Sequence, residues 1–105
     1  MKPIKQDLLE IQSFELLKAS FLFEAAIHPF RQQLLSLLCE EDRWLTATAI
    51  ADLLNASRIF CMQHLSILVG VNLLFREKNE GNVFYFINEE KLEDLNAAAK
   101  ALSQG

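Results

Sequence analysis

The sequence predicts a small, mainly α-helical domain with one β-hairpin near its C-terminal end. Apolar residues recur at three-to-four spacing through most of the chain, which is the period of an amphipathic helix. Alternation with a period of two is confined to residues 75–88, where two β-rich runs flank "NEGN". A chain of 105 residues can build one core, so we expect a single domain over residues 1–105.

The first helix is predicted over residues 4–26 and carries two apolar stripes. One stripe holds Leu9, Leu16 and Phe23, and the other holds Ile4, Leu8, Ile11, Phe14, Leu17 and Phe21. A helix with two apolar stripes contacts two surfaces, because one stripe suffices for packing on its own core. We therefore expect the other stripe to contact a second copy of the chain.

The next two helices are separated by a short extended piece. His28 and Pro29 interrupt the first helix, and a proline suits the first helical position, so a helix is predicted from Phe30 to about Cys39. "WLT" at 44–46 is expected to be extended. A further helix should then run through Leu54, with two alternative N-caps, Thr46 and Thr48, and with Asn55 left-handed after it.

Residues 55–72, "NASRIFCMQHLSILVGVN", predict a helix capped by Ser57 and closed by a left-handed Asn72. Its inward stripe is expected at i, i+4 and i+7, at Cys61, Leu65 and Leu68. The other faces then carry Arg58, Ile59, Met62, Gln63 and Ser66.

The hairpin follows, and a last helix ends the chain. Val83, Tyr85 and Ile87 alternate with Phe84 and Phe86, as expected for a strand with two different faces. Asn88 is a suitable N-cap for a helix over residues 89–103, whose apolar stripe is Leu92, Leu95, Ala99 and Leu102. The predicted order is α-α-(β)-α-α-β-β-α.

Composition limits the function classes. The net charge of −4 and a pI near 5.1 argue against a protein that covers a nucleic acid with positive charge, although residues 55–72 carry Arg58 and no acidic residue. Hydrophobic residues make up 51% of the chain, so apolar surface should remain for a homo-oligomer. The sequence has neither a signal-peptide pattern nor an apolar run long enough for a membrane span, which favours a cytoplasmic protein with Cys39 and Cys61 as thiols.

Three stretches together resemble the ArsR/SmtB family of winged helix-turn-helix transcriptional regulators. "FEAAIHPFRQQLLSLL" (23–38) is similar to the family's entry into its second helix, and "LTATAIADLLNASRIFCMQHLSIL" (45–68) to its helix-turn-helix. "FREKNEGNVFYFIN" (75–88) is similar to the family's wing, the β-hairpin beside the helix-turn-helix. The resemblance covers nearly the whole chain and implies a dimer that presents residues 57–71 to successive major grooves of double-stranded DNA.

The resemblance and the residue types together give a candidate set of sites. Arg58 and Gln63 can read base edges, and Ile59 or Met62 can contact thymine methyl groups. His64 is expected to contact a phosphate or to pack against the third helix. The full DNA-binding set is Ser57, Arg58, Ile59, Met62, Gln63, His64, Arg76, Lys78, Asn79 and Asn82, and the dimer set is Leu8, Ile11, Phe14, Leu17, Leu95, Ala99 and Leu102.

The sensing residues of the resembled family are missing. Thr46 and Thr48 stand where family sensors often have a Cys-x-Cys pair, and hydroxyls do not replace thiolates for a soft metal. The thiol-sensing branch is not matched either, because Ser36 stands at its first cysteine position and the last helix has no cysteine. Cys39 lies beside "EED", whose charges should raise the pKa of its thiol. We expect no metal and no cofactor.

No catalytic constellation is visible, so the sequence predicts a non-enzyme. Two histidines far apart offer no triad, and three glycines form no phosphate loop. One alternative to a DNA-binding regulator stays open. Ile59, Phe60, Met62 and Val69 have the spacing of anchors in a helix-in-groove contact, which would suit a winged-helix module that binds a protein partner.

Overall fold

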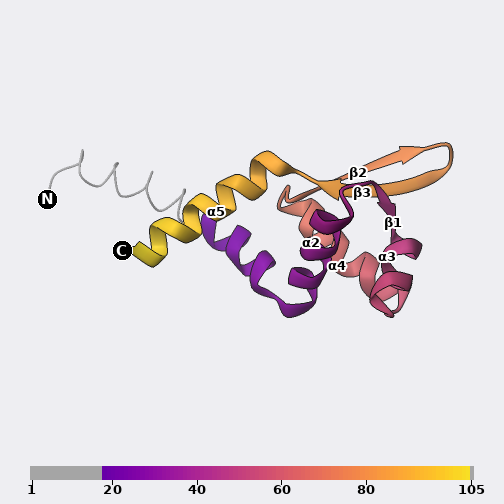
Figure 1. Ribbon diagram of the computed structural model, residues 1–105, viewed down its shortest axis with the longest axis horizontal. Helices are drawn as coiled ribbons and strands as arrows, with labels where there is room; N and C mark the ends of the chain where they lie inside the picture. The colour runs from indigo at the N-terminus through magenta and orange to yellow at the C-terminus, as the bar shows by residue number, and fades with distance from the viewer. Residues whose placement is uncertain (1–17, 105) are drawn as a thin grey trace, which may run out of the picture.

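The computed structural model describes residues 18–104, with side chains described as far as Ala101 (Figure 1). Residues 18–27 are helical, and seven elements follow in the predicted order. These are α2 (Pro29–Glu41), β1 (Leu45–Thr46), α3 (Ala47–Leu54), α4 (Arg58–Gly70), β2 (Leu74–Asn79), β3 (Asn82–Ile87) and α5 (Glu89–Gln104). The predicted mainly helical fold with a winged helix-turn-helix order is confirmed.

The start of α2 agrees with the sequence, and its end differs slightly. Pro29 occupies the first turn, and His28 is the N-cap, because its Nδ1 accepts a hydrogen bond from the Phe30 N–H at 3.2 Å. The helix continues two residues beyond the predicted end at Cys39, since the left-handed residue that stops it is Asp42, with φ 47°.

Local side-chain caps also begin the later helices where the sequence places them. Thr46, and not Thr48, caps α3, with its Oγ1 accepting from the Ala49 N–H at 3.2 Å. Ser57 caps α4, and Asn88 caps α5 by accepting from the Lys91 N–H at 3.3 Å. Asn55 and Asn72 are both left-handed, as expected.

The sheet has the order β1-β3-β2 and is antiparallel throughout. The predicted extended piece "WLT" supplies β1, whose Leu45 pairs with Tyr85 of β3. Glu80 and Gly81 both have positive φ, 51° and 84°, and form the two-residue turn between β2 and β3. A residue with a β-carbon is strained at φ 84°, which explains why glycine occupies position 81.

The core lies between α2, α3, α4 and one face of the hairpin. The predicted inward stripe of α4, Cys61, Leu65 and Leu68, is fully buried. Its largest partners from other elements are Leu34, Ile50, Leu73 and Leu74. Among the described residues, no helix is both long and apolar enough to span a bilayer.

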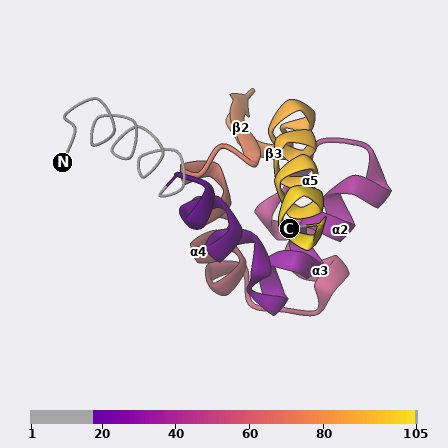
Figure 2. The same cartoon turned by 90° about the vertical axis from the view of Figure 1, so that its left-hand side faces the viewer.

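The two helices predicted to form the dimer interface lie at the end of the molecule opposite the wing, which consists of β2 and β3. Figure 1 places residues 18–27 and the C-terminal half of α5 at that end, and Figure 2 is viewed from it. Leu95 is buried in the core of its own chain, whereas Ala99 is exposed. Outside the described residues lie the predicted interface side chains Leu8, Ile11, Phe14, Leu17 and Leu102.

Candidate nucleic-acid interface

The helix α4 presents a polar and apolar mixture on its outer side. Because Cys61, Leu65 and Leu68 are buried, the orientation of the helix about its axis is fixed. Ser57 lies at its start, where its Oγ accepts from the Phe60 N–H at 3.3 Å, so its hydroxyl hydrogen remains available for donation. The five residues predicted on the other faces, Arg58, Ile59, Met62, Gln63 and Ser66, are all exposed, and so are Phe60, Ile67 and Gly70.

The wing divides its side chains between two faces. Arg76 pairs with Tyr85 and Lys78 with Val83, so these residues share the face on which Tyr85 is buried. Glu77 pairs with Phe84 and therefore lies on the other face. The acidic residue between the two basic ones thus points away from them. The remaining predicted wing residues, Asn79 and Asn82, form the last pair before the turn.

A hollow of about 500 Å³, here called the wing groove, is bordered by the start of α3, by α4 and by the wing. Arg58 of α4 and Arg76 of β2 both line it, so two arginines from different elements border one groove. Its remaining lining residues are Thr46, Ala47, Thr48, Met62, Gly81, Asn82, Val83 and Tyr85. A phosphate in this groove would meet cations on two sides.

Thr48 is a groove residue that the sequence reasoning did not assign to DNA. It was considered only as a cap or as a replaced metal ligand, yet it is exposed in the first turn of α3 and lines the wing groove. A hydroxyl at a helix N-terminus is suited to an anion, because backbone N–H groups of the first turn point the same way. The sequence feature that could have indicated this role is the position of Thr48, two residues after the cap of α3.

His64 contacts α2, a neighbour that neither predicted alternative named, and its contact with a phosphate or with the third helix stays a prediction. Its Nδ1 accepts from the Arg31 Nε at 3.1 Å, and its ring lies 4.8 Å from that of His28 between centroids. Phe30 and Phe60 complete the contacts, with ring centroids 5.2 and 4.6 Å from His64. The half-buried ring has Nε2 as its remaining polar atom for a phosphate.

The two thiols lie in different surroundings. Cys61 is fully buried, and burial raises the pKa of its thiol. Cys39 is exposed, and the pKa of its thiol is raised by partial burial first and then by the carboxylates of Glu89 and Glu40. The predicted direction is therefore confirmed, but Glu89 comes from α5 and was not expected. A raised pKa leaves less thiolate for oxidation or metal binding.

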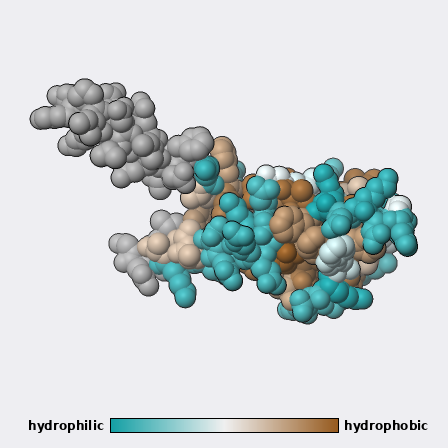
Figure 3. Space-filling view, turned by 90° about the horizontal axis from the view of Figure 1, so that it is seen from above, coloured by the Kyte–Doolittle hydropathy of each residue, from teal (hydrophilic) through white to brown (hydrophobic). Residues whose placement is uncertain are grey.

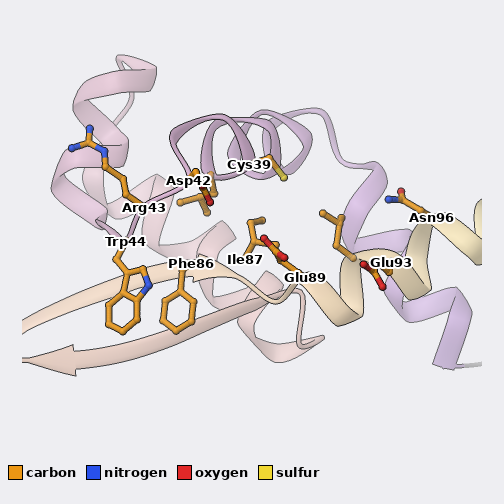
Figure 4. A pocket seen from close by; sticks show the side chains of 11 residues that line it. Cys39, Asp42, Arg43, Trp44, Phe86, Ile87, Glu89, Glu93 and Asn96 are labelled. Carbon is orange, nitrogen blue, oxygen red and sulfur yellow. The ribbon is translucent and has the colours of Figure 1, made fainter.

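Cys39 lines a second hollow, of about 370 Å³, here called the acidic pocket (Figure 4). Asp42, Glu89 and Glu93 lie around it, and at one end Trp44 stacks on Phe86 with centroids 4.3 Å apart. The residues that the structure describes contain no group of three His, Cys, Asp or Glu side chains placed to hold a metal ion.

Comparisons with known proteins agree with this architecture. A scan against protein-family models gives no match, and a search of curated protein sequences gives none either. A solved structure titled as a possible transcriptional regulator for arsenical resistance is 28% identical and covers 75% of this chain and 80% of its own, with a TM-score of 0.68. HlyU from Vibrio cholerae is 26% identical over 86% of this chain and 92% of its own, with a TM-score of 0.64.

A third neighbour covers almost the whole chain. The homodimeric winged helix-turn-helix DNA-binding domain of Mb0332 from Mycobacterium bovis, a possible ArsR-family regulator, is 19% identical. It covers 99% of this chain and 88% of its own, with a TM-score of 0.67. The first and the third of these structures are both titled as possible transcriptional regulators. The resemblance predicted from the sequence is confirmed, and this chain is similar to the ArsR-type regulators and has their winged helix-turn-helix fold.

Proposed function

We propose that this protein is a transcriptional regulator, acting as a repressor, that binds operator DNA as a homodimer and has no enzymatic activity. The observation that carries the proposal is the wing groove, which Arg58 and Arg76 both line beside the exposed side of α4. Lys78 lies on the same face of the wing as Arg76, and Glu77 lies on the opposite face. The local charge is therefore positive in a protein with a net charge of −4.

Each candidate side chain has a role that suits its position. Arg58 donates to guanine O6 and N7, and Gln63 contacts a neighbouring base edge. Arg76 and Lys78 contact phosphates, with Thr48 as an additional donor. At the tip of the wing, Asn79 and Asn82 contact the DNA backbone. Ser57 and the Nε2 of His64 donate to phosphates. Ile59 and Met62 contact thymine methyl groups.

The dimer in this proposal forms through the helix that ends at residue 27 and through α5. Phe21 is exposed on the first of these helices, and Ala99 is exposed on α5. The homodimeric state of the Mb0332 domain supports a homodimer for this chain. Light scattering of the pure protein should give twice the monomer mass at tens of micromolar. A monomer at that concentration would contradict the two-half-site mode of binding.

In this proposal no transition metal is needed for DNA binding or release. Thr46 and Thr48 offer hydroxyls where a soft metal needs thiolates, and the Oγ1 of Thr46 is engaged as a helix cap. Titration with Zn²⁺, followed by calorimetry, should show no tight stoichiometric site. Tight binding that disappears in a Cys39→Ser, Cys61→Ala double variant would contradict this part of the proposal.

Selection from random double-stranded DNA, followed by electrophoretic shift assays at about 50 mM salt, tests the main proposal. A dimer has about six cationic side chains close to the DNA phosphates, namely Arg58, Arg76 and Lys78 of each subunit. The slope of log K against log salt should therefore be near −5. If no sequence is bound at micromolar protein and low salt, the regulator proposal fails.

One observation favours a second function, a module that binds a protein partner. Ile59 is 71% exposed, the largest value among the exposed large apolar side chains of the described residues, and Phe60 and Met62 are exposed beside it. Val69, the fourth expected anchor, is half-buried because it packs against the core. Under this alternative, Met62→Ala abolishes binding to a protein partner, and Arg76→Ala leaves it unchanged. The DNA proposal predicts the larger effect for Arg76→Ala.

A further inference from the structure

The two histidines of this chain meet in space although 36 positions separate them. His28 is the N-cap of α2, and His64 lies in the middle of α4, with ring centroids 4.8 Å apart. Phe30 and Phe60, themselves 4.7 Å apart between centroids, pack against the His64 ring. The pair therefore lies at the junction where α2 supports α4.

Both imidazoles are held as hydrogen-bond acceptors at Nδ1. The Nδ1 of His28 accepts from the Phe30 N–H at 3.2 Å, and the Nδ1 of His64 accepts from the Arg31 Nε at 3.1 Å. An imidazole that accepts at Nδ1 is neutral and carries its hydrogen on Nε2. The same geometry disfavours a metal ion between the rings, because a metal needs a lone pair on a nitrogen and here Nδ1 is used and Nε2 is protonated.

Arg31 joins three helical segments through this junction. Its Nε donates to His64 of α4, its Nη1 donates to the carbonyl oxygen of Ala25 at 3.1 Å, and its own backbone belongs to α2. The link depends on His64 keeping its acceptor. A protonated His64 has no acceptor and would place a second cation beside the guanidinium.

The two groups in contact with His64 that can carry a positive charge, Arg31 and His28, oppose its protonation. Arg31 and His28 face it from α2, and from residues 18–27 Glu24 lies with Arg31 along a neighbouring groove. In the described part of the chain, no carboxylate forms an ion pair with either histidine. The pKa of His64 is lowered from 6.5 by burial first, and then by His28 and Arg31.

We propose that His28, Arg31 and His64 form a proton-sensitive link that holds α4 against α2 when both imidazoles are neutral and releases it when either is protonated. Protonation of His64 breaks its bond to Arg31, and protonation of His28 removes the cap of α2. The consequence for DNA, which rests on the proposed function, is that acid weakens operator binding by loosening the support of the reading helix.

The direction of the pH effect follows from linkage. The folded protein holds His64 with a pKa below 6.5, whereas the unfolded chain titrates it near 6.5. The unfolded state therefore binds more protons over this interval, and stability falls as the pH falls. The contribution is complete above 6.5 and is lost as the pH decreases through the lowered pKa of the folded state.

The first test uses NMR titration of the full chain without DNA. With two histidines, the imidazole C–H signals are assigned by the single variants His28→Asn and His64→Gln. We expect His64 to titrate below 6.5, to carry its hydrogen on Nε2, and to titrate at higher pH in an Arg31→Gln variant. A native His64 that titrates at or above 6.5, or that carries its hydrogen on Nδ1, overturns the proposal.

The second test measures the urea midpoint between pH 5 and 7.5. The double variant His28→Asn, His64→Gln keeps a capping acceptor and a side-chain amide oxygen but cannot be protonated, so it should lose less of its midpoint on acidification than the wild type. His64→Phe is the control that keeps the ring and removes the acceptor, and it should be weakened at pH 7.5 already. Equal losses in the wild type and the double variant overturn the proposal.

A third test connects the link to DNA. The wild-type Kd for a selected operator should rise more between pH 7.5 and 5 than that of the double variant. If acid instead tightens wild-type binding through His64, the positive charge gained by its Nε2 contact with phosphate outweighs any release of α4, and the proposed release is wrong. If no DNA is bound at any pH, the proposed function fails, whereas the NMR and urea results still decide the link.

Discussion

The two faces of the wing open onto hollows of opposite charge. Its inner face, with Arg76, borders the wing groove, which also contains Arg58. Its outer face, with Phe86, borders the acidic pocket, which contains Asp42, Glu89 and Glu93. In Figure 3 hydrophilic residues gather at the end of the molecule that holds the tip of the wing. Elsewhere in that view, hydrophobic patches are visible between hydrophilic residues.

This contrast arises from the period of a β-strand. Neighbours along β2 point to opposite faces, so the run "FREKN" gives Arg76 and Lys78 to the inner face and Phe75 and Glu77 to the outer one. The hairpin as a whole has no net charge, yet each face has its own character. A net charge of −4 therefore says little about whether one surface of this chain can bind a polyanion.

The largest expected difference between the two faces is in stability. Leu74 and Phe75 are adjacent, but Leu74 is 1% exposed and Phe75 is 48% exposed. Leu74→Ala should lower the free energy of unfolding by about 3 kcal/mol, because it leaves a cavity in the core. Phe75→Ala should cost about 1 kcal/mol, since it mainly loses its contact with Phe86. Urea unfolding followed by circular dichroism measures both, and equal losses would contradict the division of the faces.

The next effect concerns recognition by the groove side. Arg58→Ala should reduce discrimination between a selected operator and a mismatched one by about 1 to 3 kcal/mol, because it is the arginine at the start of α4 that can grip guanine at two atoms. Competitive shift assays with both DNAs give this number. Gln63→Ala is the matched control on the same exposed side, and it should lose less. Unchanged discrimination in the Arg58 variant would show that Arg58 does not recognise a base.

A smaller effect should separate the charges of the wing. Arg76→Ala removes one phosphate contact per subunit, so the slope of log K against log salt should flatten by about 1.8 for a dimer. Glu77→Ala should leave the slope and the affinity nearly unchanged, because Glu77 lies on the outer face. Titrations from about 50 to 200 mM salt measure both variants. A Glu77 variant with clearly tighter binding would show that the outer face also contributes to the field at the DNA.

The features predicted well from the sequence are those that depend on near neighbours. Thr46, Ser57 and Asn88 cap helices by accepting from backbone N–H groups three residues later, and such a bond needs no knowledge of the rest of the fold. Left-handed Asn55 and Asn72 are of the same kind. The order of the elements followed from these signals and from the two hydrophobic periods.

The features that were missed depend on tertiary contacts. His28 was expected only to interrupt the first helix together with Pro29, which agrees with its position as a cap but does not indicate its ring contact with His64, 36 positions away. Thr48 lines the wing groove because β3 lies beside α3; its place two residues after the cap of α3 is local, but the groove that it lines forms only in the folded chain. Glu89 likewise raises the pKa of Cys39 only because α5 lies beside α2 in the folded chain. Residues that meet only after folding have no periodic signal in one sequence.

The smallest expected effect tests the acidic side of the wing. The pKa of the Cys39 thiol is raised by partial burial and by Glu89 and Glu40, so at pH 8 the thiolate is scarcer than in an unfolded peptide. Glu89→Gln removes one of these charges and should speed the reaction of Cys39 with iodoacetamide by roughly two-fold. Glu93→Gln is the matched control, because Glu93 lines the same pocket but does not contribute to the raised pKa. Peptide mapping distinguishes Cys39 from buried Cys61. Equal acceleration by both variants would mean that the pocket acts through its overall negative field and not through the proximity of Glu89.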